Sequence, residues 1–259
     1  MRSRQPATHL VHFMIVPYKD KNASKREQVG EMFDTIAPKY DFLNHFLSAG
    51  IDILWRKKAI RLLRPYAPKR ILDIATGTGD LALEALALKP EKIIGVDISE
   101  GMLAVGRQKM TERGVDHIIE LRTGDSERLP LPDNDFDAAI VSFGVRNFEN
   151  LLAGLTDMQR VVRPGGVCMV LEFSRPRRFP FKQFYNFYTA TVVPFFGKLV
   201  SKDNSAYTYL DESMKAFPDG PDFIRVFEQA GFTNTQWIPL SFGIASIYLG
   251  QKPPVSSPS

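Results

Sequence analysis

From residue 70 onward, short apolar runs alternate with longer segments in which apolar residues recur every three or four positions. Short β-branched runs are typical of buried strands, and a period of three to four residues is typical of helices that bury one side. The pattern predicts strands at 70–75, 92–97, 117–122, 136–143 and 166–173, and helices at 79–88, 100–113 and 150–162. This alternation predicts a parallel sheet with crossover helices on both faces.

Two further strands are expected near the carboxyl end. DGPDFIRVFEQAGF (219–232) predicts a last helix, and TNTQWIPL (233–240) and GIASIYLG (243–250) predict a hairpin at the sheet edge. The expected fold is therefore a single α/β, Rossmann-like domain over residues 28–250. Its seven-stranded sheet is mostly parallel, with an antiparallel strand at one edge.

Two aromatic-rich segments lie outside the predicted sheet: a helical cap at 28–69 and an insertion at 174–218. In doubly wound sheets, ligands bind beyond the carboxyl ends of the strands. We therefore expect these segments to form the walls of a binding site. Residues 1–27 are expected to be a flexible basic tail, and residues 251–259 a disordered tail.

Charge and composition exclude several classes of protein. The net charge is +4, but residues 1–26 hold six of the 33 Lys and Arg and only one of the 29 Asp and Glu. The remaining chain is nearly neutral, which argues against a nucleic-acid-binding face, and no Pro-Pro-Tyr-type tetrad of a base-flipping methyltransferase occurs. The single cysteine, Cys168, excludes an internal disulfide and indicates a reducing compartment. The four histidines lack the spacing of metal ligands, so no metal is expected.

The segment LDIATGTGDLA (72–82) combines a strand end, a glycine turn and a helix start. It fits G-x-G-x-x-A through Gly77, Gly79 and Ala82, and Asp97 follows Gly77 by 20 residues. An acid at this distance typically binds the ribose of an adenosyl ligand. The loop alone does not separate a nicotinamide cofactor from S-adenosylmethionine, because both present a ribose to such a carboxylate.

Two more acids favour S-adenosylmethionine. Asp80 stands at the predicted helix start, where a dinucleotide would place its pyrophosphate. A carboxylate repels phosphate there but tolerates a sulfonium cation; the alternative is that Asp80 only complements the helix dipole. Asp73 adds an acid at the end of the first strand. We expect Asp73, Gly77 and Gly79 to belong to the cofactor site.

Two segments, one after the third strand and one leading into the fifth, complete the pattern. TGDSERLPLPDNDFD (123–137) places Asp125 and Ser126 after the third strand, to contact an adenine edge, unless they form an ordinary polar turn. RVVRPGGVCMVLEF (160–173) places a Pro-Gly-Gly turn before the fifth strand. Acid, acid and Pro-Gly-Gly in this order indicate an S-adenosylmethionine-dependent methyltransferase.

Longer motifs carry a resemblance to a narrower group. YDFLNHFLSAGIDILWR (40–56) is similar to a family pattern Y-D-x-x-N-x-x-L-S-x-G…W, and RVVRPGGVCMVLEFSRP (160–176), SFGVRNFEN (142–150) and AYTYLDESMKAFP (206–218) are further matches. On these motifs the chain resembles the ubiquinone/menaquinone biosynthesis C-methyltransferases, which are class I S-adenosylmethionine-dependent enzymes. Asp52 departs from the family, in which many members have histidine three residues before the tryptophan.

The resemblance implies a substrate and a set of cofactor contacts. The implied reaction adds one methyl group to the ring of a prenylated quinol, foremost demethylmenaquinol to menaquinol, the last step of menaquinone biosynthesis. The alternatives are a ubiquinone precursor and another small molecule or lipid. The positions that match the family's cofactor contacts are Thr78, Asp97, Asp125, Ser126 and Ser142.

Three residues are candidates for catalysis. A quinol must lose a hydroxyl proton before its ring carbon attacks a methyl group, and phenol-like hydroxyls titrate near ~10. The guanidinium of Arg146 would stabilise the anion in a dry pocket, and Asn147 would hold the oxygen or a relaying water. Tyr40 is a second candidate for contact with the ring oxygen. The alternatives are an ion pair of Arg146 with Glu149 or a cap acid, and core packing for Tyr40.

The aromatic insertion has two interpretations. Phe179 to Phe196 would line a tunnel for a polyprenyl tail and touch lipid with the help of RPRR (175–178), or would form a lid on the sheet. Neither this stretch nor HLVHFMIV (9–16) is long enough to span a membrane. We therefore expect a cytoplasmic protein, peripheral at the inner face of the cytoplasmic membrane, and a homodimer. A nucleotide-dependent oxidoreductase and a non-catalytic binding protein stay open as rival classes.

Overall fold

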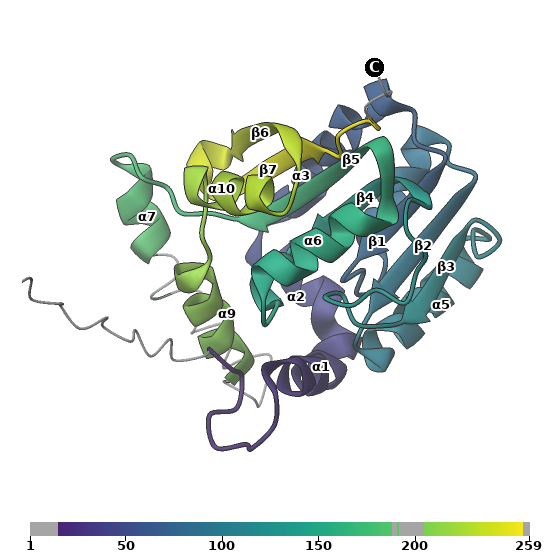
Figure 1. Cartoon of the computed structure of the whole chain (residues 1–259). Coiled ribbons are helices and arrows are strands. Elements are labelled where there is room, and N and C mark those ends of the chain that lie inside the picture. The colour runs from purple at the N-terminus through teal and green to yellow at the C-terminus, as the bar shows by residue number, and fades with distance from the viewer. Residues whose placement is uncertain (1–14, 188–190, 192–204, 256–259) are drawn as a thin grey trace, which may run out of the picture.

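Seven strands form one sheet through the centre of the molecule in this computed structural model, which describes residues 15–187, 191 and 205–255 (Figure 1). The strand order is β3-β2-β1-β4-β5-β7-β6. The first five strands run parallel, and β7 is antiparallel to both of its neighbours. The strands are β1 (Arg70–Ile74), β2 (Lys92–Asp97), β3 (Ile119–Thr123), β4 (Phe136–Ser142), β5 (Val162–Phe173), β6 (Thr233–Leu240) and β7 (Ala245–Gln251).

This arrangement confirms the predicted α/β, Rossmann-like fold with its antiparallel edge. The hairpin of β6 and β7 closes the sheet, and β7 lies between β5 and the edge strand β6. The third strand begins at Ile119, two residues later than predicted. The helix predicted over 79–88 is α4 (Asp80–Ala85) followed by a 3₁₀ turn, Leu86–Leu88.

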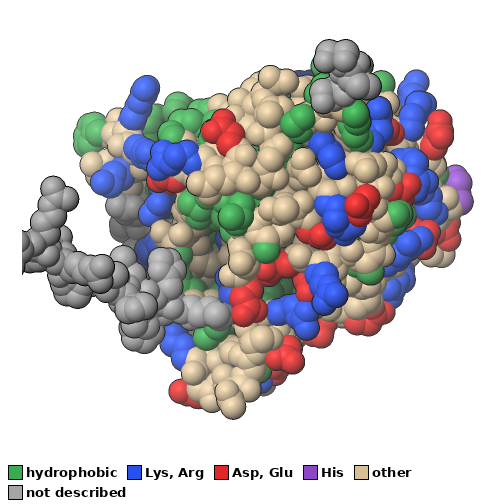
Figure 2. Space-filling view, viewed as in Figure 1, with side chains coloured by type: hydrophobic (Ala, Val, Ile, Leu, Met, Phe, Trp, Pro, Cys, Tyr) green, Lys and Arg blue, Asp and Glu red, His purple; other side chains and the backbone are tan. Residues whose placement is uncertain are grey.

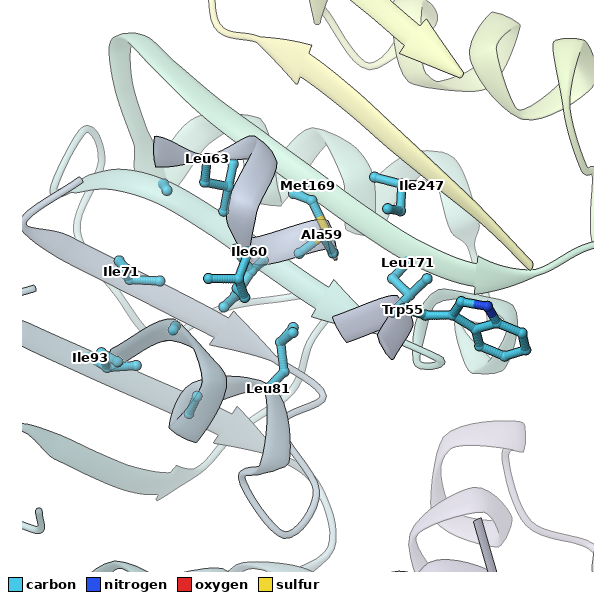
Figure 3. Packing of buried hydrophobic residues seen from close by; sticks show 14 of the residues in the cluster. Trp55, Ala59, Ile60, Leu63, Ile71, Leu81, Ile93, Met169, Leu171 and Ile247 are labelled. Carbon is cyan, nitrogen blue, oxygen red and sulfur yellow. The ribbon is translucent and has the colours of Figure 1, made fainter. Parts of the chain in front are cut away.

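Helices cover both faces of the sheet. On one face α3 (Ile51–Leu62), α4 and α5 (Glu100–Glu112) pack against the sheet; on the other lie α6 (Leu151–Val161) and α10 (Pro221–Gln229), in front of the sheet in Figure 1. Successive strand residues point to opposite faces, so Ile71 packs under α3 whereas Leu72 and Ile74 pack under the other layer. Figure 3 shows the first layer, with Ile60 of α3 and Leu63, the residue after this helix, directed at the strands. The central strands are thus buried on both sides, which explains their unbroken apolar runs.

The cap consists of α1 (Lys25–Ile36), α2 (Tyr40–Leu47) and α3, and it begins earlier than residue 28. Ser24 caps α1: it accepts from the backbone of Glu27, whose side chain accepts from Ser24 in return. This capping box fixes the start of the helix at Lys25. Lys25 and Arg26 therefore belong to the folded cap rather than to a flexible tail, while residues 1–14 lie outside the described residues.

The carboxyl-terminal boundary also shifts. Gln251 is still paired with Val167 in the sheet, and the backbone of Lys252 exchanges two hydrogen bonds with Gly165 and Gly166. The ordered chain thus continues past residue 250, because β7 needs a partner along its full length.

The insertion contributes α7 (Phe181–Phe187) and α9 (Ser205–Ala216). The part of the predicted aromatic tunnel that includes Phe195 and Phe196 lies outside the described residues. Among the described residues, no helix is long and apolar enough to cross a membrane.

Candidate active site

A cleft lies at the carboxyl ends of the strands, between the glycine loop and the cap. The empty space inside it is about 620 Å³, open solvent included. Helices α1 and α2 form one side, and the segments that follow β1, β2, β3 and β4 form the other. The predicted site residues that line it are Tyr40, Gly77, Asp97, Asp125, Ser126, Ser142 and Asn147. Four predicted residues do not line it: Asp73, Thr78, Gly79 and Arg146.

The glycine loop brings backbone close to the cleft. Gly77 and Gly79 have φ of +56° and +81°, a left-handed conformation that glycine adopts without a steric penalty. A Cβ on Gly79 would lie 2.4 Å from Cε of Met110, so this glycine serves the packing of α4 against α5. A Cβ on Gly77 would lie 3.9 Å from the ring of Tyr40, which covers the loop from the cap. Gly77 thus faces the ligand space, and Gly79 faces the core.

Asp97 is held rigidly at the end of β2. The Gly77 N–H donates to its Oδ2 at 2.8 Å, and the Ser99 N–H donates to its Oδ1 at 2.9 Å. Burial raises the pKa of Asp97, while these backbone donors oppose the shift. Each carboxylate oxygen keeps a lone pair, so the pair of oxygens can accept from the two neighbouring hydroxyls of a ribose.

Asp73 lies beneath the loop rather than in the cleft. Its Oδ2 accepts from Oγ1 of Thr76 at 2.6 Å, and its Oδ1 has no hydrogen-bond partner among the described residues. Burial raises the pKa of Asp73 to about 7. An unpaired buried carboxylate oxygen is costly, and a ligand amino group or a water in the adjoining cleft would relieve that cost.

Asp80 and Thr78 belong to a charge network outside the cleft lining. Lys109 of α5 contacts Asp80 at 2.6 Å and Asp41 of α2 at 2.8 Å. Thr78 Oγ1 donates to the same Asp41 at 2.5 Å. Asp80 also pairs with Arg56 at 3.2 Å. Its negative charge is compensated on two sides, so Asp80 does not repel a phosphate as the sequence argument assumed; instead the network ties the cap to the glycine loop.

Asp52 and His45 extend this network. Asp52 is buried and contacts Arg56 Nη2 at 2.5 Å, His45 Nδ1 at 2.9 Å and Ser48 Oγ at 2.5 Å. These contacts lower the pKa of Asp52 against the opposing effect of burial. Neither residue lines the cleft. Both instead connect α2 and α3 through these contacts.

An ion pair that the sequence analysis did not foresee borders the cleft after β3. Arg26 of α1 contacts Asp125 Oδ2 at 2.6 Å, and the Glu127 N–H donates to Asp125 Oδ1 at 2.9 Å. Ser126 and Ser142 also line the cleft. A signal in the sequence could have revealed the position of Arg26. The capping box SKRE (24–27) predicts the start of a helix, within residues that the sequence analysis assigned to a flexible tail.

Arg146 forms a buried ion pair with Glu172 of β5. Their side chains are 7% and 0% exposed, and Nη1 lies 2.8 Å from Oε1. The same Nη1 donates to the Phe143 carbonyl, and the guanidinium lies 5.4 Å from the ring centre of Phe173. The partner is therefore neither Glu149 nor a cap acid. Arg146 Nε has no hydrogen-bond partner in the described part of the chain, which leaves one donor unused beside the cleft.

Asn147 and Tyr40 both line the cleft. The buried Oδ1 of Asn147 accepts no hydrogen bond within the described residues, so it is available to a ligand hydroxyl or a water. Tyr40 packs edge-on against Phe33 at 5.8 Å. Burial raises the pKa of Tyr40, and Arg146 opposes the shift electrostatically. Both predicted residues thus reach the cleft.

Tyr209 of α9 is a residue that the sequence analysis passed over. It is 2% exposed, and its hydroxyl has no partner among the described residues. Burial raises its pKa, and Arg146 is near enough to oppose that shift. Tyr209 lies within the motif AYTYLDESMKAFP (206–218). The sequence of a helical segment does not indicate, however, in which direction a tyrosine hydroxyl points.

The fold is that of the class I S-adenosylmethionine-dependent methyltransferases. The structure resembles an S-adenosylmethionine-dependent methyltransferase of Thermotoga maritima, with a TM-score of 0.60 and 21% identity over 86% of this chain and 99% of that one. It equally resembles the [4+2]-cyclase SpnF, with a TM-score of 0.61 and 20% identity over 90% and 98% of the chains. These likenesses concern the fold alone.

The sequence comparisons are narrower. The model of the ubiE/COQ5 methyltransferase family matches residues 21–252, so the chain belongs to that family. It is 49% identical to the demethylmenaquinone methyltransferase of Bacteroides fragilis, over 92% of this chain and 97% of that protein. It is 45% identical to the ubiquinone/menaquinone biosynthesis C-methyltransferase of Geotalea daltonii, over 90% and 99%. The expected family and cofactor are confirmed.

Proposed function

We propose that this enzyme methylates the ring carbon of demethylmenaquinol to give menaquinol. The observation that carries the proposal is the near full-length match to demethylmenaquinone methyltransferases, at 49% identity for the Bacteroides fragilis protein and 45% for that of Porphyromonas gingivalis. The cleft supports it, because it is lined by Asp97, whose carboxylate suits a ribose, and by Asn147, whose buried Oδ1 has no hydrogen-bond partner among the described residues.

The residues of the cleft fit an adenosyl cofactor. Asp97 presents two oxygens to a ribose, the backbone at Gly77 allows close approach, and Ser126 with Asp125 borders the adenine end. S-adenosylmethionine supplies an electrophilic methyl group when bound. Asp73 and Thr78 lie behind the loop, so we propose that they hold its shape rather than contact the ribose.

The polar atoms after β4 suit a quinol that must become an anion. Asn147 Oδ1 accepts a hydrogen bond from the quinol hydroxyl or from a water that carries its proton away. A tyrosine is protonated at neutral pH, and burial raises the pKa of Tyr40 further, so its hydroxyl can donate to the phenolate oxygen. Arg146 contributes a fixed positive field from beneath. Since Glu172 compensates much of that charge, the role of Arg146 is shared between electrostatics and the shape of the loop.

A quinol panel tests the substrate. Purified enzyme is incubated with methyl-labelled cofactor and with short-chain demethylmenaquinol, a ubiquinone precursor or a simple phenol. Preferential labelling of demethylmenaquinol is expected. Preference for the ubiquinone precursor would replace the proposal with its first alternative, and labelling of the phenol alone would exclude both.

Site variants test the residue assignment. Arg146→Ala, Asn147→Ala and Tyr40→Phe are expected to lose most of the turnover while calorimetry shows S-adenosylmethionine binding nearly unchanged. Tyr66→Phe is a matched control, because that tyrosine lies far from the cleft and contacts Gln251. Turnover like that of the wild type in Arg146→Ala would remove the arginine from the mechanism.

Two finer expectations stay proposals. A prenylated quinol resides in lipid, so we propose that the enzyme works as a peripheral protein at the inner face of the cytoplasmic membrane. A homodimer is also proposed from the sequence, and light scattering of the purified protein tests it.

A further inference from the structure

Large hydrophobic side chains are exposed in one region of the cap. Phe42 and Phe46 of α2 are 61% and 45% exposed, and Ile51 and Leu54 of α3 are 40% and 64% exposed. The two phenylalanine rings stack at 5.8 Å. The helices are joined by the short turn Ser48–Gly50 and contact each other. We call these four residues the α2–α3 apolar patch.

The patch is the outer side of an amphipathic helix. The inner side of α3 is buried against the sheet through Trp55, Ala59 and Ile60, as Figure 3 shows. Residues three or four apart share a helix face, so Ile51 and Leu54 lie on the side that turns away from the core. Packing among the described residues therefore leaves Ile51 and Leu54 exposed.

Unpaired cations continue the same side. Lys57, Lys58, Arg61 and Arg64 are exposed, and within the described residues none of them has an ion pair or hydrogen bond. Exposed cations elsewhere are often paired: Arg107, for example, contacts Glu100. The only acid between residues 51 and 64 is Asp52, which is buried in its own network.

A second aromatic group adjoins α3. Trp55 Nε1 donates to Ser241 Oγ at 2.8 Å, and the next residue, Phe242, is 71% exposed and stacks on Phe181 of α7 at 3.8 Å. Phe179 is 80% exposed. Figure 2 shows hydrophobic side chains beside Lys and Arg side chains at the α7 end of the molecule. Most of the exposed large hydrophobic residues of the described chain thus come from α2, α3 and the α7 region.

We propose that the α2–α3 apolar patch and the four cations at and just after α3 (Lys57, Lys58, Arg61 and Arg64) dock on an anionic phospholipid bilayer. An interfacial surface combines exposed Leu and Phe side chains with Lys and Arg that attract anionic head groups. A second copy of the chain is disfavoured as the occupant, because a two-fold contact through this surface would bring unpaired cations together. The choice of lipid as partner rests on the proposed function, since α2 also carries Tyr40 of the cleft and would bring it close to a substrate held in lipid.

Vesicle flotation of the full chain tests the surface without substrate or cofactor. Vesicles of phosphatidylcholine alone are compared with vesicles that contain phosphatidylglycerol as well. Stronger binding to the anionic vesicles is expected, weakening as salt is raised. Lys57→Gln with Lys58→Gln should weaken binding roughly 25-fold, since each surface cation is worth roughly fivefold. Leu54→Gln should weaken it roughly tenfold.

Matched variants separate the surface from general effects. Lys89→Gln with Arg113→Gln removes two exposed cations from elsewhere, and Leu152→Gln removes an apolar side chain of α6 that is 40% exposed. Both controls should bind vesicles like the wild type. Equal losses in the controls, or equal binding to neutral vesicles, would overturn the proposal. Concentration-dependent dimerisation that Leu54→Gln abolishes would assign the patch to a second copy instead.

A second readout distinguishes this inference from the proposed function. The α3 variants should methylate a short-chain quinol in solution at the wild-type rate, but methylate a long-chain quinol in anionic vesicles more slowly. If neither the wild type nor any variant methylates a quinol, the proposed function is refuted. The flotation experiment would still test whether the surface binds a bilayer.

Discussion

The buried pair of Arg146 and Glu172 allows a quantitative prediction. Removing one partner of a buried ion pair leaves an uncompensated charge and typically costs ~3–5 kcal/mol, whereas replacing both partners by neutral side chains is often close to neutral. Here the arginine is 7% exposed and the glutamate is not exposed at all. The backbone N–H of Phe173 still donates to the Glu172 side chain at 2.9 Å, so the lower end of the range applies.

We therefore expect Arg146→Met and Glu172→Gln each to lower the free energy of unfolding by about 3 kcal/mol. For a domain of this size, that loss corresponds to a fall of about 6–12 °C in Tm. The double variant should lose only about 1 kcal/mol, because neither charge is then left alone. Urea denaturation of the four proteins at pH 7 and constant salt measures the coupling.

Turnover of the same four proteins separates structure from catalysis. If Arg146 stabilises the quinol anion, the stable double variant is still inactive, because restoring the fold does not restore the charge. Additive losses of stability would refute the ion-pair reasoning. Recovery of turnover in the double variant would show that Arg146 acts only by shaping the loop after β4.

Three further predictions concern single side chains. Asp73→Asn should stabilise the cofactor-free protein at pH 8 but not at pH 4: burial raises the folded pKa to about 7, so wild-type stability falls as pH rises toward and through that value. Lys109→Met should lower kcat/KM about tenfold, since the lysine joins cap and glycine loop through two carboxylates and misplacing catalytic groups is costly. Tyr209→Phe should stabilise the protein by about 1 kcal/mol by removing a buried hydroxyl that has no partner.

Each of these has a measurement and a contrary result. Denaturant midpoints between pH 4 and pH 8 test Asp73, and parallel profiles for variant and wild type would contradict its raised pKa. Steady-state kinetics compare Lys109→Met with the control Lys92→Met, which removes a cation that pairs with Glu120 on the sheet. Equal effects on kcat/KM would argue against a specific role of Lys109 in joining the cap to the glycine loop. Calorimetric unfolding tests Tyr209, and a loss of stability would indicate that water satisfies its hydroxyl.

The sequence by itself determined the order of the elements and the cofactor loop. The central strands of a parallel sheet are buried on both faces and therefore appear as unbroken apolar runs. The strands between residues 70 and 173 could be located from these runs alone. The spacing from Gly77 to Asp97 is also local, because one βαβ unit brings the two residues together at the carboxyl edge. Both features depend on neighbours along the chain, and the structure places both residues in the cleft.

Only the tertiary structure decided how charges and helices pair over long distances. Arg146 meets Glu172 because β4 and β5 lie side by side, not because any nearby residue signals it. Asp80 does not repel a phosphate as assumed, because Lys109 of α5 and Arg56 of α3 pair with its carboxylate. Arg26 reaches Asp125 across 99 residues. The energy of a charge is set by everything that surrounds it in space, and a linear pattern carries that information only where sequence neighbours and spatial neighbours coincide.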